Sequence, residues 1–306
     1  MVGLGCFISV GRELETAVER VKLAESLGYE SVYVTHIAAR DPFTVLTAYA
    51  AATERIRLGT GVTPIYARTP VASAQAAATI DEYSGGRMVL GLGVSHRPVV
   101  EGWYGQQIDK PVREMREYLS TVRAIFRGED PPPGEKWPTG FHFMGYEARA
   151  DLPIYIAGLS PAMLRLAGEL ADGVILWLCE PTYIREVVVP EVTKGREKAG
   201  KPFEGFDIVA AVPSAVTDDP DAARDVMRKD LVPYFSLPFY RAMIERSGFE
   251  PDIEKAEGFI GTLAAIGTAD EASAVIDSYF EAGATSPGVG PIAKTDFEAT
   301  LCALGG

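Results

Sequence analysis

Two histidines follow apolar stretches, where their side chains could do acid–base chemistry. His36 comes directly after the expected strand 31–35, and His96 closely follows the expected strand 88–94. Imidazole titrates near neutral pH, so two such rings in one cavity could move a proton or stabilise a developing charge. The alternative is that each ring only hydrogen-bonds a loop carbonyl, but the equivalent placement after two strands favours function. We predict that His36 and His96 are catalytic, whereas His142, in a proline-rich loop, is expected to be structural or exposed.

Glycines stand at the ends of two expected strands. Gly59 and Gly61 end one of them, and Gly91 and Gly93 end another. Without a Cβ they would let a flat ligand approach the backbone, but tight packing inside a barrel would require small residues equally well. Both interpretations stay open from the spacing alone. The stretch G-L-G-V-S-H is not a dinucleotide-binding fingerprint, because histidine replaces the third glycine of G-x-G-x-x-G.

A third candidate is the stretch Gly158, Leu159 and Ser160, which precedes a proline and the start of an expected helix. Free backbone N–H groups and the helix dipole at such a start attract phosphate, and the Ser160 hydroxyl would add a donor. Ser160 would also fit a role as a helix cap alone, which is the commoner situation. In barrels the usual phosphate site follows the last two strands, so this position would be atypical.

The composition is that of an ordinary soluble globular protein. Of the 306 residues, 47% are hydrophobic and 23% are charged. The net charge of -13 argues against binding to nucleic acid or an anionic membrane, since both require a basic surface. No apolar run is long enough for a membrane helix, and the first ten residues lack the features of a secretory signal. The expected location is therefore the cytoplasm.

Cysteine and histidine spacing gives no sign of a metal site. Cys6, Cys179 and Cys302 are odd in number, far apart and without C-x-x-C spacing, which argues against a disulfide framework or a zinc cluster. We expect all three to be buried apolar side chains. No H-E-x-x-H spacing is present, so no metal is predicted.

The chain alternates short apolar strands with amphipathic helices. Continuous apolar strands are typical of a parallel sheet that helices cover on both faces. Eight strand–helix units in a chain of this length favour a (β/α)8 TIM barrel, an α/β fold, over an open doubly wound sheet. The expected strands are 2–10, 31–35, 56–62, 88–94, 154–157, 174–178, 208–212 and 284–289.

Helix boundaries carry two recurring signals. A capping side chain followed by proline marks the first turn of a helix. A glycine just beyond the last turn takes the left-handed conformation that ends it. These signals predict helix starts at Asp41, Thr69, Ser160 and Asp219, and helix ends at Gly28, Gly173 and Gly283.

Two stretches interrupt the alternation. Residues 128–150 contain the run Pro131-Pro132-Pro133 and predict a long loop. Residues 230–266 mix aromatic and charged residues without strand signals, and we expect extra helices there, over the mouth of the barrel. Barrel active sites lie at this mouth, formed by the carboxyl ends of the strands. Neither insertion requires a second domain, so we expect one domain over 1–306.

Several stretches together resemble a known family, the luciferase-like flavin and deazaflavin oxidoreductases, and in particular its coenzyme F420-dependent branch. They are AESLGYESVYVTH (24–36), RIRLGTGVTPIYARTP (55–70), AAATIDEYSGGRMVLGLGVSH (76–96) and LAGELADGVILW (166–177). The resemblance implies a TIM barrel with insertions, usually dimeric, that holds the cofactor ring at its mouth. It also implies a non-prolyl cis peptide bond between Gly61 and Val62, behind the ring.

The resemblance further implies roles for individual residues. His36 matches the histidine that assists hydride transfer, Thr35 replaces the acidic residue before it, and His96 falls where sugar-phosphate-oxidising relatives have a catalytic glutamate. The last difference puts the substrate and the acid–base scheme of those relatives in doubt for this chain. Cofactor contacts are implied for Thr35, Gly61, Val62, Thr63, Val94, Ser95, Gly158, Leu159 and Ser160, the last three in the phosphate loop.

The leading hypothesis is therefore a coenzyme F420-dependent oxidoreductase that exchanges a hydride between the deazaflavin C5 and a small organic substrate. The substrate would lie in a cavity lined by His36, His96 and Trp177. The alternatives are an FMN-dependent monooxygenase, a non-catalytic cofactor-binding protein and a phosphosugar-processing barrel without a redox cofactor. A homodimer is expected.

Overall fold

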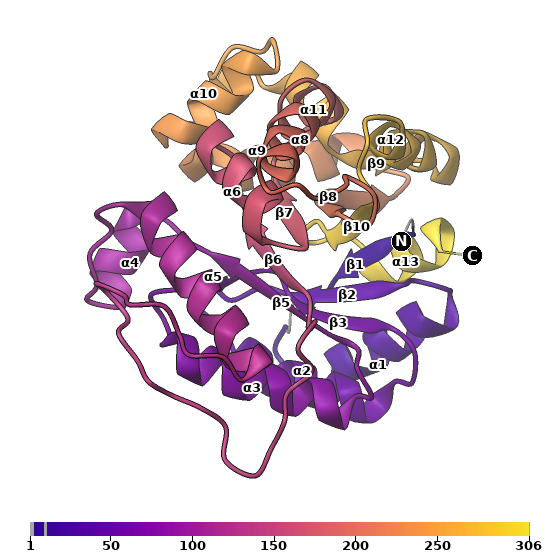
Figure 1. Cartoon of the computed structure of the whole chain (residues 1–306). Coiled ribbons are helices and arrows are strands. Elements are labelled where there is room, and N and C mark those ends of the chain that lie inside the picture. The colour runs from indigo at the N-terminus through magenta and orange to yellow at the C-terminus, as the bar shows by residue number, and fades with distance from the viewer. Residues whose placement is uncertain (1–2, 9–10, 306) are drawn as a thin grey trace.

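Eight parallel strands close into a barrel in the computed structural model, which describes residues 3–8 and 11–305 (Figure 1). Neighbouring strands pair in the order β1-β2-β3-β5-β6-β7-β8-β10, and β10 pairs with β1 to close the ring. The predicted TIM barrel is confirmed. The barrel strands are β1 (Gly5–Phe7), β2 (Ser31–Val34), β3 (Arg57–Thr60), β5 (Met88–Gly93), β6 (Ile154–Ala157), β7 (Gly173–Trp177), β8 (Asp207–Val216) and β10 (Ser286–Pro291).

All eight predicted strands are present, and two short ones were missed. Residues 2, 9 and 10 of the first predicted strand lie outside the described residues. The missed strands are β4 (Thr63–Pro64), which pairs with β5, and β9 (Ala265–Gly267), which pairs with the end of β8. Each has two or three residues, too few to show an alternating or continuous apolar pattern.

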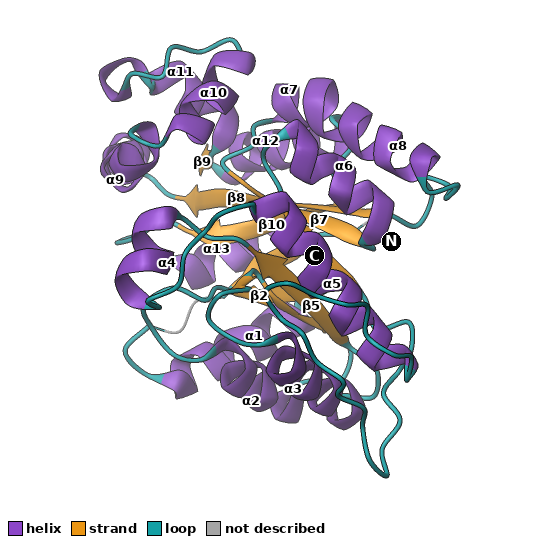
Figure 2. Cartoon of the chain, turned by 60° about the vertical axis from the view of Figure 1, so that its left-hand side comes forward, coloured by secondary structure: helices purple, strands orange, loops and turns teal. Residues whose placement is uncertain are grey.

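Helices surround the strands, and α9, α10 and α11 group together at one end (Figure 2). Among the described residues, none of these helices has the length and apolar character needed to span a membrane. The helices are α1 (Leu14–Ser26), α2 (Pro42–Ala52), α3 (Pro70–Tyr83), α4 (Arg97–Trp103), α5 (Pro111–Arg127), α6 (Pro161–Leu170), α7 (Pro181–Tyr183), the π-helical turn η1 (Ile184–Val188), α8 (Val189–Lys198), α9 (Pro220–Phe235), α10 (Pro238–Arg246), the 3-10 turn η2 (Ile253–Lys255), α11 (Glu257–Leu263), α12 (Ala269–Glu281) and α13 (Phe297–Leu304).

The capping signals predicted the helix starts correctly. Asp41, Thr69, Ser160 and Asp219 each accept a hydrogen bond from a backbone N–H of the first turn, next to a proline. A side-chain oxygen at this position satisfies an N–H group that has no partner within the helix. These caps fix where α2, α3, α6 and α9 leave the mouth of the barrel.

The glycine signal was correct twice and wrong once. Gly28 and Gly283 have φ values of 83° and 102°, as expected for residues that end helices. Gly173 is instead the first residue of β7, after α6 has ended at Leu170. A Cβ there would lie 2.8 Å from the Asp207 carbonyl oxygen, so this glycine is required by close strand packing.

Aromatic side chains fill the barrel interior. Phe7 and Tyr33 stack with ring centroids 5.2 Å apart, and Tyr155 is buried with them. Below them, Arg57 forms an ion pair with buried Asp207 at 3.1 Å. Because the interior is occupied, a ligand must bind above it, at the carboxyl ends of the strands. The full interior cluster is Phe7, Tyr33, Val89, Tyr155, Ile175, Val209 and Ala211.

The four strand-end glycines serve this packing. A Cβ on Gly59 would lie 2.4 Å from the Tyr33 ring, and one on Gly91 would lie 1.9 Å from the Thr60 carbonyl oxygen. A Cβ on Gly61 or Gly93 would also meet a protein side chain closer than 3.0 Å. Of the two interpretations left open by the spacing, the structure supports barrel packing at these positions.

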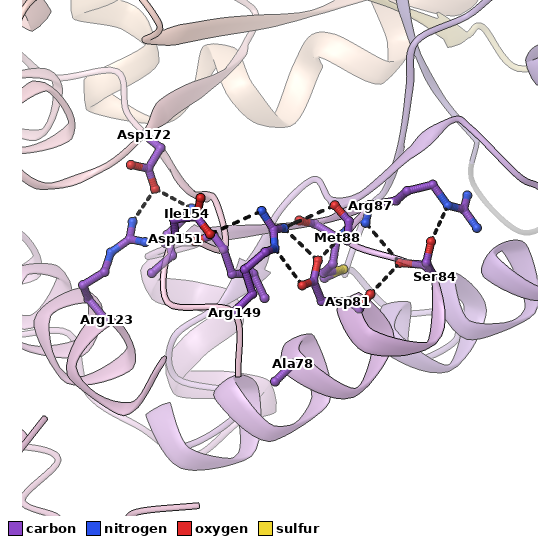
Figure 3. Close-up of polar contacts among 12 residues, drawn as sticks. Ala78, Asp81, Ser84, Arg87, Met88, Arg123, Arg149, Asp151, Ile154 and Asp172 are labelled. Atoms are coloured by element: carbon purple, nitrogen blue, oxygen red, sulfur yellow. Dashed lines mark hydrogen bonds and ion pairs between the residues drawn. The ribbon is translucent and has the colours of Figure 1, made fainter. Parts of the chain in front are cut away.

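Residues 128–153 contain no helix or strand, as predicted for the loop, and they pack along α3 and α5. Lys136 forms an ion pair with Glu114 on α5 at 3.0 Å. Arg149 donates two hydrogen bonds to the carboxylate of Asp81, near the end of α3, at 2.7 and 2.8 Å (Figure 3). The loop is thus tied to the outer side of the barrel.

Two of the three cysteine predictions are correct. Cys6 and Cys179 are buried, but Cys302 is exposed on α13. Leu301 lies on the buried face of this amphipathic helix, whereas the next residue, Cys302, lies on its exposed face.

Candidate active site

The carboxyl ends of β2 and β5 bring His36 and His96 to the same end of the barrel. His36 lies two residues beyond β2. His96 lies three residues beyond β5, directly before α4, and makes no side-chain capping bond to that helix. Only β3 separates these two strands in the barrel. Thr63 in β4, Trp177 at the end of β7 and the loop before α6 belong to this same end.

His36 is half-buried and held by a neighbouring strand. Its Nδ1 lies 2.6 Å from the hydroxyl oxygen of Thr63. The ion pair between Asp41 and Arg68 lies nearby. Burial lowers the pKa of His36, while Asp41 acts to raise it and Arg68 to lower it further. The neutral imidazole is therefore favoured at neutral pH, and one ring nitrogen remains for a ligand.

His96 is surrounded by aromatic rings of the helical insertion. Its ring centroid lies 6.1 Å from that of Tyr234, 5.6 Å from that of Phe239 and 5.9 Å from that of Tyr240. Burial lowers the pKa of His96, against an opposing effect of the Ser95 carbonyl. Its Nδ1 is buried without a hydrogen-bond partner among the described residues, which favours the neutral ring.

The residues before His96 and after Trp177 have unusual backbone conformations. Ser95 has a φ of 56° and Leu178 a φ of 60°, both in the left-handed region that side chains other than glycine rarely adopt. Trp177 is 36% exposed, and its ring centroid lies 6.0 Å from that of Tyr234. The two strained turns thus flank His96 and Trp177, where the insertion contacts the barrel.

The remaining predicted residues lie on the same strand ends. The peptide bond between Gly61 and Val62 is cis, as the resemblance implied. Val62 packs on the barrel-interior cluster, and Val94 is half-buried directly after β5. Thr35 follows β2 and precedes His36. These positions are consistent with a planar ligand above the packed interior, but their contacts with a cofactor stay predictions.

The loop of Gly158, Leu159 and Ser160 connects β6 to α6. The Ser160 side chain accepts a hydrogen bond from the Met163 N–H at 3.3 Å, so the capping interpretation is confirmed. Ser160 is also exposed, which leaves its hydroxyl accessible to a phosphate. The Leu159 carbonyl accepts a hydrogen bond of 2.7 Å from the hydroxyl of Tyr183.

Sequence reasoning missed Tyr183. It lies in α7, directly after the β7 loop, and Glu180 caps this helix by accepting hydrogen bonds from Thr182 and Tyr183 N–H groups at 2.8 and 2.7 Å. The signal was present, because Glu180 followed by Pro181 repeats the pattern of a capping side chain before proline. That pattern would have placed a helix start, and hence Tyr183, beside the predicted phosphate loop.

A cavity of about 670 Å³ lies at the opposite end of the barrel. Asp151, Asp172 and Lys201, which line it, stand just before β6, β7 and β8. Arginine and carboxylate side chains pair with one another there, as Arg123 does with Asp172. This end of a barrel serves stability, so we do not assign the chemistry to it. His142 also lies away from the mouth, exposed and 3.1 Å from Asp130.

Comparison with known proteins gives consistent results. The family model described as luciferase-like monooxygenase matches residues 2–286. A Mycobacterium tuberculosis protein, provisionally named a coenzyme F420-dependent oxidoreductase, is 34% identical over 284 residues, which cover 84% of this chain and 79% of that protein. The 5,10-methylenetetrahydromethanopterin reductase of Archaeoglobus fulgidus is 35% identical over 238 residues, which cover 77% of this chain and 70% of that protein.

Solved structures share the fold. The coenzyme F420-dependent tetrahydromethanopterin reductase of Methanopyrus kandleri superimposes with a TM-score of 0.84 at 24% identity, covering 99% of this chain and 97% of that one. A type II Baeyer–Villiger monooxygenase of Pseudomonas putida, in complex with FMN, superimposes with a TM-score of 0.76 at 17% identity, covering 100% and 97%. At these identities the likeness establishes the architecture alone.

Proposed function

Because the chain belongs to the luciferase-like monooxygenase family, we propose that this oxidoreductase depends on coenzyme F420 and acts on a small organic substrate. The name of the Mycobacterium tuberculosis relative, which is 34% identical, supports this choice of cofactor. The single structural observation that carries the proposal is the placement of two half-buried histidines, His36 and His96, at one mouth of a barrel whose interior is filled.

The residues at the mouth fit such a cofactor. The exposed Ser160 hydroxyl and the start of α6 would hold its phosphate. Val62 and Val94 would contact the ring from the strand ends. When bound, the deazaflavin supplies hydride transfer at its C5, which is chemistry that no side chain provides.

The two histidines would donate or accept protons at the substrate. Burial lowers the pKa of both, so at neutral pH each ring offers one donor and one acceptor nitrogen. Thr63 occupies Nδ1 of His36 and so orients its other nitrogen. Nδ1 of His96 is buried without a hydrogen-bond partner among the described residues, so the other ring nitrogen would be the one to meet a substrate oxygen. Replacing His36 by alanine is therefore expected to reduce turnover of an identified substrate strongly.

A specific observation also favours a second candidate, an FMN-dependent monooxygenase, because the Pseudomonas putida structure of this fold contains FMN. Titration of the purified protein with coenzyme F420 and with FMN, followed by cofactor fluorescence, separates the two. We expect tighter binding of coenzyme F420. Tighter binding of FMN would favour the monooxygenase, and failure to bind either would contradict both proposals. Bound coenzyme F420 that exchanges no hydride would indicate a non-catalytic binding protein.

We also propose that the protein is a homodimer. The exposed positions of α2 include Thr44, Thr47 and Ala51, which carry no charge although the net charge of the chain is -13. Such a surface is suited to contact with a second copy. Light scattering of the purified protein tests this, and a monomeric mass at micromolar concentration would contradict it.

A further inference from the structure

Four aromatic rings surround His96 or contact its neighbours at the mouth. With His96 they form what we call the aromatic cluster. Tyr234 and Tyr240 have ring centroids 5.0 Å apart, and Phe239 lies 4.9 Å from Tyr240. The members come from three separate parts of the chain: the end of β5, the end of β7, and the consecutive helices α9 and α10. The cluster consists of His96, Trp177, Tyr234, Phe239 and Tyr240.

The cluster is closed on one side and open on the other. Tyr240 is only 3% exposed, so it forms the base. Trp177 and Phe239 are 36% and 42% exposed, although both are large and apolar. Exposed aromatic surface at a strand-end mouth is costly in water and is typical of a surface that a ligand covers.

The described residues show no cation–π contact with the aromatic cluster. Among residues 3–8 and 11–305, every arginine or lysine found over an aromatic ring faces a ring outside the cluster. The charged group that acts on a cluster member is Asp230, which raises the pKa of Tyr234 together with the larger effect of burial. His96 itself is held neutral by burial. An anionic ligand would therefore lose its hydration here without gaining an ion pair.

We propose that the aromatic cluster is the substrate subsite and that it selects an uncharged molecule bearing a flat or alicyclic apolar ring. This inference rests on the proposed function, since it names the substrate class of the same site. The ring of the substrate would lie between Trp177 and Phe239, and a hydroxyl or carbonyl oxygen would hydrogen-bond the half-buried imidazole of His96. Phosphorylated sugars and other small anions would be rejected, because the cluster offers their charge no partner.

The test compares matched probes on the intact protein with coenzyme F420 bound. Isothermal titration measures binding of 2-naphthol, which is neutral at pH 7, of 2-naphthalenesulfonate, which has the same ring with a negative charge, and of glucose 6-phosphate. We expect 2-naphthol to bind at least about tenfold more tightly than either anion. Equal or tighter binding of an anion would overturn the inference.

Two variants locate the binding site. Phe239→Ala should weaken binding of 2-naphthol by about fivefold, as expected for the loss of one ring contact. Phe239→Arg should shift the preference toward the sulfonate. The control is Tyr83→Ala, which removes a ring that is 63% exposed at the end of α3, away from the cluster, and should change nothing. Equal effects of Phe239→Ala and Tyr83→Ala would place the probe elsewhere and refute the assignment.

Different results would contradict the proposed substrate class and the proposed function. If coenzyme F420 binds but 2-naphthol shows no preference over the anions, the substrate class is wrong and the proposed function stands. If neither coenzyme F420 nor FMN binds, the titrations are repeated on the protein alone. A preference for 2-naphthol that Phe239→Ala removes would then support the apolar subsite in a protein without the proposed activity, and its absence would refute the subsite as well.

Discussion

Nδ1 of His36 lies 2.6 Å from the hydroxyl oxygen of Thr63, and this contact joins the end of β2 to β4 at the mouth of the barrel. Thr63 is fully buried, so its hydroxyl has little choice of partner. Whichever group donates, the bond determines which nitrogen of the imidazole carries the proton and in which direction the other nitrogen points. Thr63 is therefore the residue that orients His36.

Replacing Thr63 by valine keeps the side-chain shape and removes this hydrogen bond. We expect Thr63→Val to lower the free energy of unfolding by about 1 kcal/mol and to leave the His36 ring in a mixture of tautomers. Thr63→Ser retains the hydroxyl and should keep a single tautomer. Urea denaturation measures the first effect and imidazole ¹⁵N chemical shifts the second. A single unchanged tautomer in the valine variant would show that Thr63 does not orient the ring.

The buried histidines predict how stability depends on pH. The folded protein holds the pKa of both His36 and His96 below the ordinary value, mainly through burial. Well above about pH 6.5 both rings are neutral in the folded and unfolded states. As the pH falls below this value, the unfolded chain takes up protons that the folded protein resists. The free energy of unfolding should then fall, by at most about 1.4 kcal/mol per pH unit for each histidine, until the folded rings also protonate.

Substitution by glutamine tests the origin of this slope. The double variant His36→Gln, His96→Gln should show a flatter stability profile between about pH 6.5 and 5.5. His142→Gln changes an exposed ring beside Asp130 and serves as the control. A slope that the double variant leaves unchanged would assign the pH dependence to other groups.

The barrel was predictable because its signals are local. Strands such as β6 and β7 are short apolar runs, and the caps Asp41, Thr69, Ser160 and Asp219 mark helix starts through contacts within three residues along the chain. Local signals fail where packing between distant segments decides. Gly173 has the sequence context of a helix end, but the approach of β8 at Asp207 is what requires a glycine there.

The site was only partly predictable, for the same reason. His36 and His96 follow from strand order alone, since all parallel strands end at the same mouth. The contact between His96 and Tyr240 joins residues far apart in the chain, and periodicity within the insertion gives no information about which ring it meets. Trp177 was predicted to line the site, but the structure is needed to show that Tyr234 packs against it.

Gly91 offers a test of the close packing between β3 and β5. A Cβ at this position would lie 1.9 Å from the Thr60 carbonyl oxygen, a backbone atom that cannot rotate away. The Thr60 hydroxyl also bonds the Gly91 N–H at 2.8 Å. We expect Gly91→Ala to lower the free energy of unfolding by about 3 kcal/mol. Gly102 on α4 has open space around it, so Gly102→Ala should be neutral or stabilise by up to about 1 kcal/mol. Similar chemical denaturation midpoints for the two variants would contradict this difference.

Tyr183 provides a final prediction, which concerns the proposed phosphate loop. Burial raises the pKa of its hydroxyl to about 12, so it remains protonated at neutral pH and donates to the Leu159 carbonyl at 2.7 Å. A matched contact exists elsewhere, because the buried Tyr279 hydroxyl donates to the Leu263 carbonyl at 2.8 Å. Tyr183→Phe and Tyr279→Phe should each lower the free energy of unfolding by about 1 kcal/mol.

Only the first variant should affect the cofactor. If Tyr183 holds the loop from Gly158 to Ser160 in position to bind phosphate, Tyr183→Phe should weaken binding of coenzyme F420 by about fivefold, equivalent to about 1 kcal/mol. It should leave the affinity for a deazaflavin that lacks the phosphate unchanged, because the ring contacts lie on other strands. Fluorescence titration with both molecules measures this difference. Equal weakening for the two molecules would mean that Tyr183 does not act through the phosphate, and an equal effect of Tyr279→Phe would mean that both variants act through stability alone. Either result would contradict a role of Tyr183 in positioning the loop that ends at Ser160.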